Sequence, residues 1–203
     1  MQPVDLPSAF ERLNEIGGAL RFAVFSGADG DGDSALAAIA TVLPDIDTAK
    51  LRSLGFRRID DRTFYGDWYD AESDALLQMG TYTTEDGRTL VDPKLRDIDG
   101  VAITHGARAI PDSGAGGQFA YALSWTPYGL RARPREVQDL FCGIRDFILP
   151  AQLEHEILDW SSPRLPEASE YFAAGMEWWG VFLFTAYVPA LRRLTVIVGS
   201  TTD

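Results

Sequence analysis

Three aspartates on alternate positions are the residues of this sequence with the most evident chemistry. Asp29, Asp31 and Asp33 are separated by single glycines, and residues 22–49 contain no lysine or arginine. Carboxylates so close together repel one another, so the loop needs water, a cation, a helix N-terminus or a basic partner to offset its charge. The identity of that counter-charge is the first functional question that the sequence raises.

The aspartate loop has the beginning of a calcium-binding pattern, D-x-D-x-D. An EF-hand loop also requires glycine at its sixth position and glutamate at its twelfth, where this chain has Ser34 and Ala40. The loop is therefore not an EF-hand, and a divalent cation held partly through water is the one cofactor that it suggests. In the other interpretation, the loop is solvated and Asp33 caps a helix over residues 34–43.

The chain has two histidines that could take part in acid–base chemistry. His105 follows an expected strand over residues 101–104, a place where catalytic groups often lie, and it is the catalytic candidate. His155 lies between two glutamates on an expected helix, which favours a solvated or salt-bridged role. The single cysteine, Cys142, borders an apolar helix stripe, as a small buried residue does. The sequence has no nucleophile elbow and no phosphate-binding glycine motif.

The net charge of −12 restricts the classes of partner. Residues 1–100 carry 19 acids and 10 bases, whereas residues 101–203 carry 11 and 8. Such a chain repels nucleic acid and anionic membranes, so we expect neither as a partner, and it attracts basic proteins. Sixteen arginines against two lysines suggest a GC-rich, bacterial genome. The first residues lack the basic and apolar runs of a signal peptide, which predicts a cytoplasmic protein.

Large aromatic residues next to acids mark an expected partner-binding surface. In a strand, Trp178 and Trp179 would point to opposite faces, so one of them would face solvent, a helix layer or a partner. Aromatic rings among acids are suited to contact a basic protein. The residues of this expected surface are Asp67, Trp68, Asp70, Glu72, Trp178 and Trp179.

Hydrophobic spacing predicts an α+β fold with a mainly antiparallel sheet and several helices. The strongest helix begins at Pro134, where one apolar stripe continues to Ile148. The expected helices cover residues 7–16, 34–43, 48–54, 70–78, 134–148, 150–160 and 167–174. The expected strands cover residues 20–25, 56–59, 63–68, a hairpin over 81–90, 101–104, 118–125, and a hairpin over 179–198. We expect a single domain over residues 1–203, with a subdivision near 99–117 as the alternative.

These observations favour a non-catalytic, acidic protein that binds a partner, as an inhibitor or immunity-type protein does. The uneven negative charge and the lack of a complete catalytic set are the reasons. The alternative is a hydrolase assisted by a divalent metal at Asp29, Asp31 and Asp33.

Overall fold

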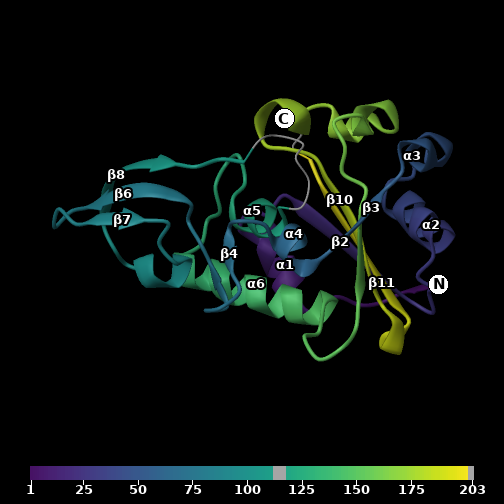
Figure 1. The fold of residues 1–203 in the computed structure, drawn as a ribbon, viewed down its shortest axis with the longest axis horizontal. Coiled ribbons are helices and arrows are strands. Elements are labelled where there is room, and N and C mark those ends of the chain that lie inside the picture. Colours follow the sequence, from purple (N-terminus) through teal and green to yellow (C-terminus); the bar gives the residue numbers. More distant parts are fainter. Residues whose placement is uncertain (112–117, 201–203) are drawn as a thin grey trace.

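A computed structural model describes residues 1–111 and 118–200 of the chain. Its centre is a six-stranded antiparallel sheet in the order β1-β2-β11-β10-β9-β3 (Figure 1). The predicted α+β class with a mainly antiparallel sheet is confirmed. The strands are β1 (Gln2–Pro3), β2 (Leu20–Ser26), β3 (Arg57–Ile59), β9 (Glu156–Asp159), β10 (Phe182–Val188) and β11 (Arg193–Gly199).

The two central strands, β10 and β11, are apolar along almost their whole length because both faces of the sheet are covered. Side chains alternate along β11, so that Leu194 and Val196 face one core and Ile197 faces the other. The predicted hairpin at the end of the chain is confirmed, with Val188 opposite Arg193 next to the turn.

Different helices cover the two faces of the sheet (Figure 1). In α6, the predicted stripe from Val137 to Ile148 is buried, as the spacing indicates. One face carries α1 (Ser8–Glu15), α4 (Asp61–Tyr65), α5 (Phe119–Ser124) and α6 (Pro134–Ile148). The opposite face carries α2 (Gly32–Val42), α3 (Thr48–Leu54) and the short 3-10 turns η2 (Leu165–Glu167) and η3 (Glu170–Phe172).

A smaller sheet, here called the side sheet, projects from the end of the molecule beyond α6 (Figure 1). It consists of β6 (Gly80–Thr84), β7 (Thr89–Val91) and β8 (Ile103–Arg108), with β6 in the middle. The hairpin predicted over residues 81–90 is confirmed, whereas the strand expected at 101–104 lies later, in β8. The remaining elements are β4 (Tyr69–Asp70), β5 (Ala75–Leu76), η1 (Leu95–Ile98), α7 (Gly175–Trp178) and η4 (Pro189–Leu191).

Two predicted strands are helices in the structure. Residues 61–65 form α4 because the carboxylate of Asp60 accepts a hydrogen bond from the Thr63 amide at 2.8 Å, which caps the first turn. Residues 119–124 form α5, which is buried on all sides and so lacks the amphipathic period of a surface helix.

Two predicted helices are also wrong. Residues 70–78 form β4, a turn and β5, and the turn is set by Asp74 in the left-handed region (φ 49°) and by Asp70, which accepts a hydrogen bond from the Glu72 amide. Residues 156–159 form β9, whose place between β10 and β3 overrides a local helical pattern.

Among residues 1–111 and 118–200, no helix is both long and apolar enough to cross a membrane. The single-domain organisation stays a prediction, and residues 112–117 of the possible subdivision near 99–117 lie outside the described residues.

Candidate functional site

A hollow lined by acidic, basic and aromatic side chains lies between α4, β4 and the C-terminal part of α6, and we call it the α4–α6 cleft. Its volume is about 930 Å³. Two stretches that are distant in the sequence, within residues 61–74 and 145–155, form its walls, so that only the folded chain brings their charged groups together. Its lining residues are Asp61, Arg62, Tyr65, Gly66, Tyr69, Asp70, Ala71, Glu72, Asp74, Arg145, Leu149, Ala151 and His155.

Arg145 lines the cleft, and its side chain is only 13% exposed. Its guanidinium contacts the Asp74 carboxylate, donates to the Tyr69 hydroxyl at 2.9 Å, and pairs with Asp146 at 2.7 Å. The Tyr69 hydroxyl in turn donates to Asp74 Oδ1 at 2.8 Å. Arg145 therefore has its charge offset within the protein and is committed to internal contacts.

The protonation states of the groups around Arg145 follow from these contacts and from burial. The hydrogen bond from Arg145 lowers the pKa of the Asp74 carboxyl below its usual value. Burial, together with the hydrogen bond to Asp74, raises the pKa of the Tyr69 phenol to about 12. Burial also raises the pKa of the neighbouring Tyr65. At neutral pH, Asp74 is therefore charged and both tyrosines keep their protons.

His155 forms a second polar group at the rim of the cleft. Its Nε2 lies 2.7 Å from Asp61 Oδ1, and its Nδ1 lies 3.2 Å from the Leu153 carbonyl oxygen. Both neighbours are acceptors, and a neutral imidazole has only one N–H, so both hydrogen bonds form only when the ring carries two protons. His155 does contact a carboxylate, that of Asp61, although it lies on the segment that leads into β9 and not on the expected helix.

Two residues of the expected partner surface, Asp70 and Glu72, line this cleft. Asp70 accepts a hydrogen bond from the Ser73 hydroxyl, which lowers the pKa of its carboxyl, and it lies 3.6 Å from Lys94 Nζ. Glu72 is exposed, and its carboxylate has no ion-pair partner among the described residues. The lining contains four carboxylates and two guanidiniums, so the cleft is acidic.

The tryptophans of the expected surface are placed differently from its acids. Trp68 is 4% exposed and lies edge-on to Tyr121, with ring centroids 5.1 Å apart. Trp179 is 1% exposed, and its Nε1 donates to the Trp125 carbonyl at 2.7 Å. These two rings are core residues, and the neighbouring Asp67 is exposed.

The expectation that Trp178 and Trp179 lie in a strand is wrong. Trp178 is the last residue of α7 and Trp179 follows it, so the alternation of a strand does not apply. The side chain of Trp178 lies outside the described part of the structure.

The three carboxylates of the aspartate loop have three separate partners. Asp29 pairs with Arg192 at 2.6 Å and Asp33 pairs with Arg52 at 2.6 Å. Asp31 accepts a hydrogen bond from the Ser34 amide at 2.7 Å, which lowers the pKa of its carboxyl. Asp31 is therefore the cap of α2, and the prediction that Asp33 caps this helix is wrong.

No group of three or more His, Cys, Asp or Glu side chains in the described ranges is arranged to hold a metal ion. The counter-charges of the aspartate loop come from α3 and from the turn before β11, segments that the local sequence could not reveal.

The catalytic candidate His105 lies in β8 on the exposed surface of the side sheet. Its Nδ1 is 3.1 Å from the Thr104 hydroxyl. It lies outside the α4–α6 cleft, whose histidine is His155.

Comparison with known protein families, with curated proteins and with solved structures finds no match for this chain.

Proposed function

We propose that this protein binds a basic partner protein, and that a lysine or arginine side chain of the partner enters the α4–α6 cleft. The observation that supports this most directly is the gathering of Asp61, Asp70, Glu72 and Asp74 around one hollow of about 930 Å³. In this proposal the protein acts by occupying its partner, as an inhibitor or immunity-type protein does.

The charges within the cleft differ in their availability to a partner. Asp74 is held by Arg145, and Asp61 Oδ1 lies 2.7 Å from His155 Nε2, so these two carboxylates already have partners within the protein. Glu72 is exposed, and the ion pair of Asp70 with Lys94 is long, at 3.6 Å. An entering cation therefore gains most from Asp70 and Glu72.

The same lining supports binding better than acid–base catalysis. Both ring nitrogens of His155 face acceptors within the protein, which leaves neither nitrogen directed at a substrate. Tyr69, whose pKa is raised to about 12, keeps its proton at neutral pH. The net charge of −12 adds long-range attraction for a basic partner and speeds encounter at low salt.

The experiment measures binding of a fluorescent hexa-arginine peptide by polarisation, with hexa-glutamate as the negative probe. The double variant Asp70→Asn/Glu72→Gln removes two carboxylates from the cleft. Each exposed charge contact contributes about 0.2–1 kcal/mol, so we expect binding to weaken by roughly 2- to 30-fold.

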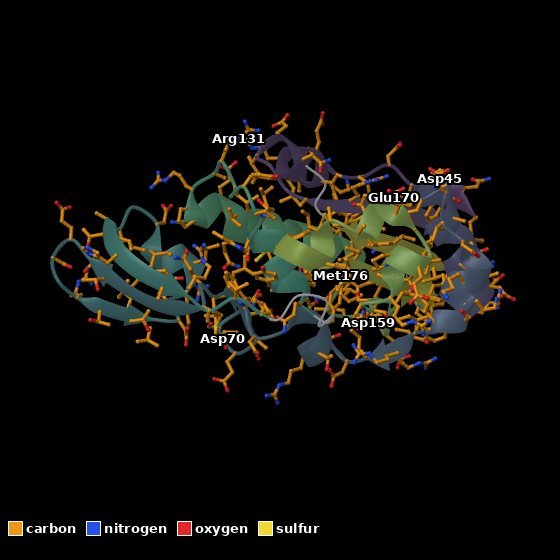
Figure 2. All side chains as sticks on the ribbon, turned by 90° about the horizontal axis from the view of Figure 1, so that it is seen from above. Asp45, Asp70, Arg131, Asp159, Glu170 and Met176 are labelled. Atoms are coloured by element: carbon orange, nitrogen blue, oxygen red, sulfur yellow. The ribbon has the colours of Figure 1, made fainter. Side chains whose placement is uncertain are left out.

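The matched control is Asp5→Asn/Asp45→Asn, which removes the same charge from two exposed residues. Asp45 and Asp70 project from well-separated parts of the surface (Figure 2). If both double variants weaken binding equally, the peptide is responding to net charge alone and the proposed site is wrong.

A further inference from the structure

The outer strand of the side sheet, β8, has an open edge. Within the described residues, β8 pairs with β6 only. The Ala109 amide donates to the Met79 carbonyl at 3.1 Å, and hydrogen bonding in an antiparallel pair alternates along the strand. His105 and Ala107 therefore direct their backbone groups at β6, whereas Gly106 and Arg108 direct theirs away from it.

This edge lacks the features that usually prevent strands from pairing between molecules. Such edges are commonly blocked by charged side chains or by proline, and residues 103–107 contain neither an acid, a lysine, an arginine nor a proline. Arg108 ends the strand, and its guanidinium lies 3.3 Å from the centre of the Trp125 ring, against the body of the protein. The open backbone groups are therefore accessible.

The outer face of the side sheet is also free of acidic and basic side chains other than one histidine. Residues directly opposite in an antiparallel pair share a face, and the register places Val91, Thr81 and Ala107 in one row. The next row consists of Thr89, Thr83 and His105. Val91 is 67% exposed. On a chain of net charge −12, this is a surface that a molecule of the same charge can approach with little repulsion.

We propose that two copies of this chain associate through β8, paired antiparallel across a two-fold axis at Gly106. A two-fold axis makes any antiparallel edge complementary to itself, so no second sequence is required. In this register the outward-directed backbone N–H and C=O of Gly106 form hydrogen bonds with those of Gly106 in the second copy. His105 then lies opposite Ala107 of the second copy. The two three-stranded side sheets then form one continuous sheet of six strands.

The position of the side sheet reduces the repulsion between the two bodies. The Arg108 end of β8 lies against the body, and the side sheet projects from it (Figure 1). Antiparallel pairing therefore places the two bodies at opposite ends of the joined sheet. Salt screens the charge that remains, with a Debye length of about 10 Å at 0.1 M, so we expect dimerisation to strengthen as salt rises.

The first test is disulfide cross-linking of the full chain in a Cys142→Ser background. In His105→Cys/Ala107→Cys, each new thiol faces the other new thiol of the second copy, at the close spacing of a non-hydrogen-bonded pair. We expect a reducible dimer to form roughly tenfold faster than in Thr89→Cys/Val91→Cys, whose thiols are equally exposed on the opposite edge strand. Equal rates in the two variants would overturn the proposal.

The second test needs no cysteine. Sedimentation equilibrium of the unmodified chain over about a hundredfold range of concentration should show a monomer and a dimer in exchange, with more dimer at higher salt. Ala107→Lys should shift the protein to monomer, whereas Thr89→Lys on β7 should leave the dimer in place. A chain that is monomeric at every concentration, or a dimer that both lysines weaken equally, contradicts pairing through β8.

Discussion

Replacing Asp74 by asparagine should lower stability by an amount that depends on pH. The change removes one of the two carboxylates that pair with Arg145 and leaves Asp146 in place. A hydrogen bond to a charged group contributes about 1.5–3 kcal/mol. Because the Asp74 side chain is 55% exposed, solvent screening reduces this to about 1 kcal/mol at neutral pH. A loss of this size lowers Tm by about 2–4 °C in a domain of this length.

The sign of the pH dependence follows from the lowered pKa of Asp74. The stabilisation is present above the unfolded-state pKa of about 3.9 and is lost as pH falls through the lower pKa of the folded state. Asparagine does not titrate in this range. The difference in unfolding free energy between the parent protein and Asp74→Asn should therefore be greatest near neutral pH and should decrease below about pH 4.

Urea unfolding at a series of pH values measures this difference, with Asp45→Asn as the exposed control. Spectroscopic titration of the tyrosines provides a second readout. The pKa of Tyr69 is about 12 in the parent protein and should be lower in the variant. It should stay above the ordinary value of about 10, because burial is the largest cause of the raised pKa. A stability difference that is the same at pH 7 and at low pH would refute the pairing of Asp74 with Arg145.

Three further predictions concern residues outside the cleft. Asp31→Ala should lower Tm measurably, because Asp31 caps α2, and Asp33→Ala should lower it clearly less; the reverse order would contradict the cap. Millimolar calcium should leave Tm unchanged, because the carboxylates of the aspartate loop contact Arg192, the Ser34 amide and Arg52; a rise that Asp29→Asn abolishes would restore the metal interpretation. Trp179→Ala should cost about 3–5 kcal/mol of unfolding free energy, measured by calorimetry, because its ring is in the core. A variant as stable as the parent protein would contradict that placement.

Local sequence patterns predicted the elements in which one periodicity is strong. In α6, apolar residues recur at helical spacing from Val137 to Ile148, and the helix begins at Pro134 as expected. In β10 and β11, long apolar runs around Pro189 indicated a hairpin, and the structure pairs them residue by residue. In these elements the apolar residues of the segment itself show which side chains are buried, so the secondary structure can be predicted without knowing the neighbouring segments.

The wrong elements are those whose environment overrides the local pattern. The segment that contains β9 is rich in glutamate and leucine and resembles a helix, yet it completes the main sheet between β10 and β3. In α5, apolar residues occur at almost every position because helices and the sheet surround it, and a short apolar run does not distinguish a buried helix from a strand. At α4, Asp60 was the available signal for a helix. An aspartate just before the first turn is typical of a helix start, because its carboxylate can accept a hydrogen bond from a first-turn amide, here that of Thr63.

The sequence also reveals only part of the candidate site: it shows the charged residues, but not the distant residues that pair with them. Asp70 and Glu72 were expected on a binding surface because acids close to large aromatic residues, and the uneven net charge, are visible in the sequence. The contacts of the other two cleft carboxylates were not visible there, since Arg145 is separated from Asp74 by 71 positions and His155 from Asp61 by 94. The aspartate loop drew attention through its spacing, but its counter-charges also come from distant segments. A cluster of like charges in a sequence therefore identifies where a counter-charge is required. Only the fold decides whether the protein supplies it, as at Asp29 and Asp33, or leaves a carboxylate such as Glu72 without an ion pair among the described residues.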